Sequence, residues 1–150
     1  MKEKLKRVFE VQPNYLELAY NDLSIGDIEE FDDMQLGFRV DEKGNSISEW
    51  IGNEYYVVGF ESACGDPILV KSDEKELSIY FMIHDDWSTL EKIANSVEDF
   101  SKILDIISQY DMQDEKEAEK LIKKIEKIAP KGCTYWTILI KTENEILNEE

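Results

Sequence analysis

The period of the apolar residues changes along the chain, and this change limits the possible folds more than any other feature. In the first half, short apolar runs are separated by turn residues, which predicts β-strands at 36–40, 55–60, 68–70 and 77–83. In the second half, apolar residues recur at helical spacing, which predicts helices at 96–110 and 115–129. Strands followed by helices indicate an α+β fold. We expect a single domain over residues 1–150, with a mostly antiparallel sheet of about four to six strands and flanking helices.

Local signals define the ends of the predicted helices in the second half. Ser96 followed by Asp99 resembles a capping box, so the first helix is expected to begin there. Pro130 and Gly132 follow the second helix and would end it. The segment 134–140 is ambiguous, because its apolar spacing fits a helix while its β-branched residues favour a strand. We favour the helix.

The N-terminal part shows weaker patterns. Residues 2–10 can form a short helix that ends before Pro13. The stretch 27–33 carries five acidic residues, and its only apolar side chains are Ile28 and Phe31. We interpret this stretch as a solvated, acidic loop or short helix.

The chain is strongly acidic, with 34 Asp and Glu against 17 Lys and Arg and a formal net charge of −17. This charge repels nucleic acid and anionic membranes, because phosphate contacts require basic groups. It attracts basic partners and speeds their association. The alternative is that the acidity only keeps the protein in solution. We expect a basic protein partner, and neither nucleic acid nor a membrane.

Cysteine use and the N-terminus predict a compartment. Cys64 and Cys133 are the only cysteines, and two thiols without a secretory signal indicate a reducing environment. Residues 1–11 are basic but lack the apolar core of a secretory signal. No window approaches the roughly 18 apolar residues of a membrane span. The sequence therefore predicts a cytoplasmic protein.

His84 is the only histidine, and it precedes Asp85 and Asp86. His and Asp form an acid–base pair in principle, but adjacent residues of a strand point to opposite faces. A thiol–imidazole pair of Cys64 and His84 is a second candidate, although its spacing matches no nucleophile motif. One His and two separated Cys do not make a transition-metal site, and no phosphate-binding Gly-rich loop is present. We expect no enzymatic activity, no metal and no cofactor.

Several motifs occur in a defined order along the chain. They are Tyr55 to Phe60 (YYVVGF), Cys64 to Val70 (CGDPILV), Ile79 to His84 (IYFMIH), Trp87, and Ile93 to Phe100 (IANSVEDF). The ordered set, over about residues 36–107, resembles the central pattern of the SUKH superfamily. The superfamily includes the yeast cell-wall-assembly regulator and many bacterial immunity proteins. The resemblance implies one SUKH-like α+β domain without catalytic residues, which binds and blocks a cognate toxin, often a nuclease.

We therefore expect an immunity protein that covers the active site of a basic polymorphic toxin. Charge would speed association, and apolar anchors would slow dissociation. The residues expected to bind the partner are dense local acids together with two apolar anchors: Asp27, Glu29, Glu30, Phe31, Asp32, Asp33, Asp85, Asp86 and Trp87. For Trp87, packing within the fold is the alternative. Two other functions remain open, a regulatory scaffold that binds several partners and a small hydrolase that uses Cys64 or His84.

Overall fold

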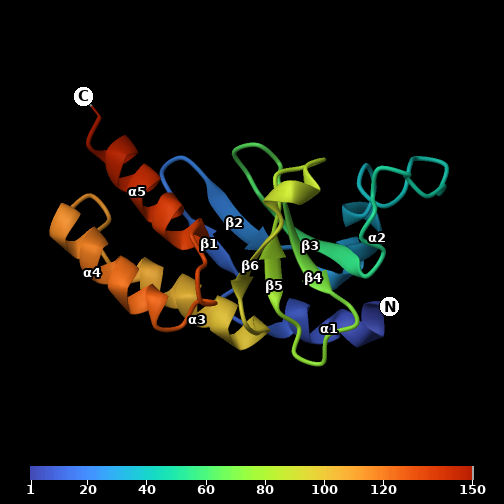
Figure 1. Cartoon of the computed structure of the whole chain (residues 1–150), viewed down its shortest axis with the longest axis horizontal. Helices are drawn as coiled ribbons and strands as arrows, with labels where there is room; N and C mark the ends of the chain where they lie inside the picture. The colour runs from blue at the N-terminus through green and yellow to red at the C-terminus, as the bar shows by residue number, and fades with distance from the viewer. Residues whose placement is uncertain (150) are drawn as a thin grey trace.

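Six antiparallel strands form one sheet, in which each strand pairs with the next strand along the chain (Figure 1). The structure is a computed structural model and describes residues 1–149. The elements of that part are, in order, α1 Lys2–Glu10, β1 Tyr15–Glu17, β2 Asp22–Ile25, the 3-10 helix η1 Ile28–Glu30, α2 Phe31–Met34, β3 Tyr55–Glu61, β4 Pro67–Lys71, β5 Ile79–Phe81, the 3-10 helix η2 Trp87–Thr89, β6 Glu91–Ala94, α3 Val97–Ser108, α4 Glu115–Glu126 and α5 Tyr135–Leu147. This architecture confirms the predicted α+β fold.

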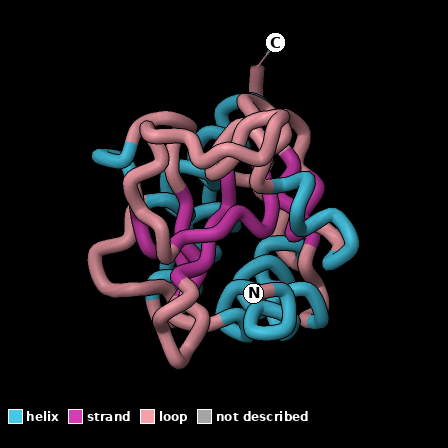
Figure 2. The backbone as a smooth tube through the Cα atoms, turned by 90° about the vertical axis from the view of Figure 1, so that its right-hand side faces the viewer, coloured by secondary structure: helices cyan, strands magenta, loops and turns pink. Residues whose placement is uncertain are grey.

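One face of the sheet carries the larger core. Leu23, Ile68 and Ile79 from the strands are fully buried in it. The sheet is curled, so that α3 contacts both edge strands, β1 and β6, while α4 packs against α3 and α5. Figure 2 shows the strands in the middle of the molecule, with α1 below them. No helix of residues 1–149 has both the length and the apolar character needed to cross a membrane.

The opposite face is covered by α2 and by the long connection from α2 to β3. Its core joins Val57 and Leu69 of the sheet to Met34 and Trp50 of the covering segment. Trp87 packs edge-on against Trp50, with ring centroids 4.8 Å apart. Both faces of the central strands β3 and β4 are therefore covered.

The strand predicted at 36–40 is wrong, because the chain turns there. The N–H of Phe38 donates to the carbonyl oxygen of Gln35 at 3.1 Å, which closes a turn after α2. Gly37 has a φ of +83°, outside the extended region. Leu36 is 44% exposed, so the alternation of apolar residues does not correspond to a buried face.

Most of the other predicted elements are confirmed. α1, β3, β4, α3 and α4 lie where the sequence predicts them, and the ambiguous last segment is the helix α5. The stretch 27–33 forms η1 and the start of α2, as the short-helix interpretation expects. The strand predicted at 77–83 is shorter, and only Ile79–Phe81 pair as β5. The sequence missed β1, β2 and β6, because strands of three or four residues are too short to show a period.

Ser96 provides a test of how α3 is stabilised. Its Oγ accepts a hydrogen bond from the N–H of Asp99 at 3.0 Å, at the predicted N-cap position. We expect Ser96→Ala to lower the free energy of unfolding by about 1 kcal/mol, measured by urea denaturation. The control Ser108→Ala, at the exposed end of the same helix, should change it by less than about 0.5 kcal/mol. Equal effects would show that the cap does not stabilise α3.

Candidate functional site

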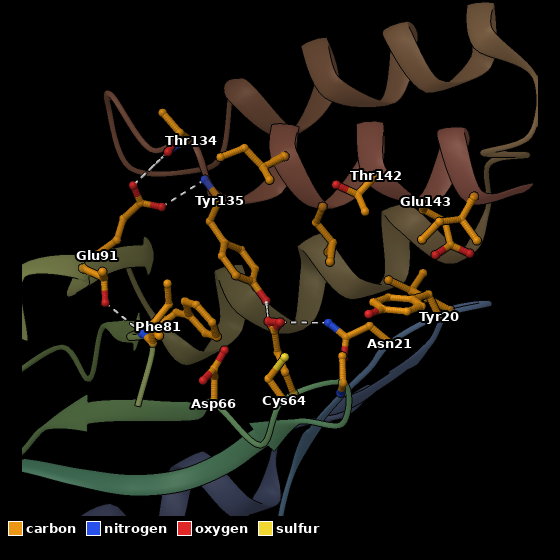
Figure 3. Close-up of a pocket in the computed structure, with 18 residues that line it drawn as sticks. Tyr20, Asn21, Cys64, Asp66, Phe81, Glu91, Thr134, Tyr135, Thr142 and Glu143 are labelled. Atoms are coloured by element: carbon orange, nitrogen blue, oxygen red, sulfur yellow. Dashed lines mark hydrogen bonds between the residues drawn. The ribbon is translucent and has the colours of Figure 1, made fainter. Parts of the chain in front are cut away.

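Three connections meet at one end of the sheet, because successive antiparallel strands reverse direction at each connection. They join β1 to β2 at 18–21, β3 to β4 at 62–66 and β5 to β6 at 82–90. α5 lies beside this end of the sheet (Figure 1). Between α5 and the sheet lies a groove of about 430 Å³, here called the α5 groove, and Figure 3 shows its lining.

The lining of the α5 groove combines apolar walls with carboxylates. Leu18 and Leu139 belong to the apolar walls, together with the rings of Phe81 and Tyr135, whose centroids are 4.7 Å apart. None of the described residues that line the groove is Lys or Arg. Its four carboxylates belong to Glu61, Asp66, Glu91 and Glu143.

A β-bulge in β3 turns Glu61 towards the groove. Between the pairs Val57–Leu69 and Gly59–Ile68, β3 has one residue more than β4. An extra residue switches the side chains that follow it to the other face of a sheet. Without the bulge, Glu61 would share the face of Val57, which lies in the opposite core.

Glu61 is half-buried at the floor of the groove, where each of its oxygens accepts one hydrogen bond. Its Oε1 accepts from Asn21 Nδ2 at 2.8 Å, and its Oε2 accepts from the Tyr135 hydroxyl at 2.9 Å (Figure 3). Burial raises the pKa of Glu61, and the nearby Asp66 carboxylate adds to the rise, although the two hydrogen bonds oppose it. The ionised form of Glu61 is therefore disfavoured by its surroundings.

Asp66 fixes the adjoining connection at 82–90. Its Oδ1 accepts from the backbone N–H of His84 at 3.1 Å and from the ring Nδ1 of His84 at 2.6 Å. The Asp66 side chain is only 12% exposed. The structure thus pairs His84 with a residue of the Gly65-Asp66-Pro67 turn, and not with the adjacent Asp85 or Asp86.

The other two carboxylates connect α5 to the sheet. Glu91 Oε1 accepts from the N–H of Tyr135 at 2.9 Å, and Glu91 Oε2 accepts from the Thr134 hydroxyl at 3.1 Å, which binds the start of α5 to β6. Glu143, on α5, is 3% exposed, and its Oε1 accepts from the N–H of Ala19 at 2.7 Å. Glu143 Oε2 has no hydrogen-bond partner among residues 1–149.

The two cysteines are free thiols in different surroundings. Cys64 is exposed and lines the groove, and no hydrogen bond joins it to His84 within the described part of the chain. Burial raises the pKa of the Cys133 thiol, and the Glu91 carboxylate, 3.7 Å from Cys133 Sγ, raises it further. A raised pKa disfavours the thiolate that a nucleophile requires.

The structure separates the two groups of acids that the sequence predicts at a binding surface. Asp85, Asp86 and Trp87 lie in the β5–β6 connection, which adjoins the groove. Asp86 caps η2 by accepting from the N–H of Ser88 at 3.1 Å, and Asp85 adopts a left-handed backbone with φ of 63°. The other group follows the end of β2 that lies away from the groove, and its acids are exposed there: Asp27, Glu29, Glu30, Asp32 and Asp33.

The two predicted anchors differ in their surroundings. Phe31 is buried in the core, where it packs against Phe9 and Tyr56 at centroid distances of 6.2 Å and 5.8 Å. Its expected role as an exposed anchor is therefore wrong, since α2 needs an apolar contact with the sheet. Trp87 is half-buried between Trp50 and Tyr55, and its Nε1 donates to the carbonyl oxygen of Glu49 at 3.2 Å.

Sequence reasoning missed the residues that form the groove itself. Glu61 and Glu143 approach the same space only because a bulge reorients β3 and because the missed β1–β2 hairpin contacts α5. One signal was present, since an isolated glycine inside a strand pattern, here Gly59, indicates a bulge or a close backbone approach.

Comparison of the chain with protein-family models, with curated proteins and with solved structures finds no match. Function therefore has to be argued from the site itself. Within residues 1–149, no group of three or more His, Cys, Asp and Glu side chains is placed to hold a metal ion.

The raised pKa of Glu61 predicts a pH-dependent effect on stability. A carboxyl with a raised pKa in the fold stabilises it when protonated, and this stability is lost as the pH rises through the folded pKa. We expect Glu61→Gln to raise the melting temperature at pH 7, and to raise it less below pH 4.5, the ordinary value for Glu. Thermal unfolding across this range, with Glu119→Gln on the exposed side of α4 as the control for one lost charge, measures the difference. A gain at pH 7 no larger for Glu61→Gln than for the control would contradict the prediction.

The burial of Phe31 predicts a loss of stability on truncation. We expect Phe31→Ala to lower the free energy of unfolding by about 3–5 kcal/mol, because it leaves a cavity between α1, α2 and β3. Urea denaturation measures this loss, and Phe31→Leu should cost less because it keeps most of the volume. The control Leu36→Ala truncates an exposed residue just after α2 and should change stability by less than about 0.5 kcal/mol. A similarly small effect of Phe31→Ala would contradict the burial of Phe31 in the core.

Proposed function

We propose that the protein binds a basic protein toxin, such as a nuclease, and neutralises it by covering its active site in the cytoplasm. The resemblance to SUKH immunity proteins implies this function. The observation that carries the proposal is the lining of the α5 groove, where four carboxylates and apolar walls meet without a Lys or Arg. No catalytic step, metal or cofactor forms part of the proposal.

The charges of the fold leave most of its acids available to a partner. Within residues 1–149, only seven carboxylates lie within 4.0 Å of a Lys or Arg nitrogen, out of 34 acidic residues in the chain. A net charge of −17 therefore acts on the surroundings instead of being compensated inside the fold. A basic partner gains attraction over long distances, and its rate of association rises.

Exposed apolar side chains surround the carboxylates of the groove. Tyr20 is 63% exposed, Ile138 is 60% exposed and Ile83 is 48% exposed, and all three line the groove. Large apolar side chains beside desolvated polar groups are typical of the energetically dominant parts of protein interfaces. The groove thus offers both the charge that speeds association and the apolar area that slows dissociation.

Occlusion is the mechanism that this surface supports. A nuclease binds the phosphates of its substrate through basic side chains, and a rigid acidic surface competes for the same side chains. Asp85 and Asp86 extend the acidic surface beside the groove, whereas the acids of 27–33 lie at the other end of the strands. We therefore assign contact to the first group and long-range attraction to the second.

Two other functions make different demands on the same residues. A regulatory scaffold would bind several partners weakly, without one dominant anchor. A hydrolase would use Cys64 or His84, and the Asp66–His84 pair is the one contact that favours it, because it orients the imidazole. Alanine at Cys64 would abolish the activity of such a hydrolase, whereas it should leave the binding of a toxin largely intact.

The test of the proposed function is capture of a partner, followed by inhibition. The immobilised protein is exposed to a lysate of its source cells at about 0.05 M and about 0.3 M salt, which spans weak and strong screening of surface charges. One basic protein should remain bound at the higher salt. The protein that captured it, added in solution, should then inhibit the toxic activity of this partner. Capture of only weak, salt-labile and varied proteins would contradict the proposal.

A pair of tyrosines places the binding surface. We expect Tyr20→Ala, in the groove, to weaken the binding of the captured partner about tenfold or more, because exposed aromatic anchors dominate interfaces. Tyr15→Ala is the matched control, since Tyr15 is 49% exposed on the preceding strand but does not line the groove. Titration calorimetry of both variants gives the two affinities. Equal losses of affinity in the two variants would show that the groove is not the binding surface.

A further inference from the structure

We infer that the α5 groove receives an arginine side chain of the protein partner, whose guanidinium is bound by the carboxylates of Glu61 and Asp66. This inference deepens the proposed function and rests on it. It names the chemical group that the groove is built to hold, whereas the proposed function requires only that the surface binds a basic protein.

The walls of the groove suit an organic cation on an apolar stem. Phe81 and Tyr135 form a tilted aromatic pair on one side, and Leu139 and Ile146 of α5 add aliphatic surface. The methylene groups of an arginine can cover such a surface while the charged end reaches polar atoms. A bare metal ion would not use these walls, and residues 1–149 contain no group of three or more His, Cys, Asp and Glu side chains placed to hold one.

Both carboxylates keep acceptor capacity towards the groove. Asp66 Oδ1 accepts two hydrogen bonds from His84, whereas Asp66 Oδ2 has no hydrogen-bond partner among the described residues. Each oxygen of Glu61 accepts one hydrogen bond, and a carboxylate oxygen can accept a second one. A donor supplied by a partner can therefore bind both groups.

The groove holds negative charge that the fold does not compensate. Glu61, Asp66 and Glu143 approach it from the floor, from the β3–β4 turn and from α5. His84, a group that can carry positive charge, is bound to Asp66 Oδ1. The proximity of Asp66 already disfavours the ionised form of Glu61, and a cation in the groove would reverse this effect.

Arginine fits these acceptors better than lysine. A guanidinium is planar and presents five N–H donors in a fixed fork, so that it can bind carboxylates on two walls at once. It is also more weakly hydrated than an ammonium group and costs less to remove from water. Two neighbouring carboxylates beside apolar walls therefore favour a guanidinium over an ammonium group.

The test titrates the full chain with three small probes that share a butyl chain, namely N-butylguanidinium, N-butylammonium and N-butylurea. Backbone amide signals are followed by NMR, which suits a protein of 17.5 kDa. We expect N-butylguanidinium to shift the amides of residues that line the groove, with a dissociation constant on the order of millimolar for so small a ligand. N-butylurea has nearly the same shape without charge and should shift these amides at least tenfold more weakly.

Variants connect the binding to the named carboxylates. Asp66→Asn keeps an acceptor for the backbone N–H of His84 but removes the charge, and we expect it to weaken N-butylguanidinium binding at least fivefold. Glu61→Gln keeps acceptor and donor capacity for its two neighbours and should have a similar effect. Glu119→Gln, which removes one exposed charge from α4, should leave the binding unchanged. Thermal unfolding of each variant confirms that it is folded before titration.

Three outcomes would overturn the inference: no shift in the groove, equal shifts by the charged and neutral probes, or tighter binding of N-butylammonium. Each of these can occur while a basic partner is still captured, so the arginine inference can fail alone. If N-butylguanidinium binds the groove but no partner survives moderate salt, the proposed function fails and the cation site remains. In the captured complex, loss of affinity on Asp66→Asn, but not on Glu119→Gln, would show that the partner uses the same site.

Discussion

The close approach of β2 to Gly59 determines where the functional surface lies. A Cβ atom at this position would collide with the carbonyl oxygen of Ser24 and come within 2.9 Å of the Cα of Ile25, so only glycine fits. The bulge in β3 occurs at the same place, and it directs Glu61 towards α5. One residue without a side chain thus decides whether the sheet presents a carboxylate or an apolar side chain to the groove.

The strand order then brings the other residues of the site to the same end of the sheet. In a sheet where each strand pairs with the next, alternate connections return to the same end, so three turns meet there. The turn residues Asn21 and Asp66 are thereby brought to Glu61, although they come from different hairpins. α5 closes the groove because Glu91 and Glu143 bind its start and its middle to the sheet.

The sequence predicts most of the longer helices and strands of this arrangement, but not which side chains meet between them. Apolar runs located β3 and β4, which are buried on both faces, and helical spacing located α3 and α4, which each bury one face. Local charge density located the exposed acids of 27–33 correctly, but it took Phe31 for an anchor when the residue secures α2 to the core. Charge density says how acidic a segment is, whereas burial depends on contacts between segments that a single sequence does not display.

One of the residues missed in the groove, Glu61, carries a cost to the fold. It is held where burial and the nearby Asp66 carboxylate oppose its charge. Patterns of propensity and hydrophobicity predict residues that favour the fold, so they pass over residues that oppose it. Such groups persist when another interaction uses them, and a cation supplied by a partner is the interaction that would turn this cost into binding energy.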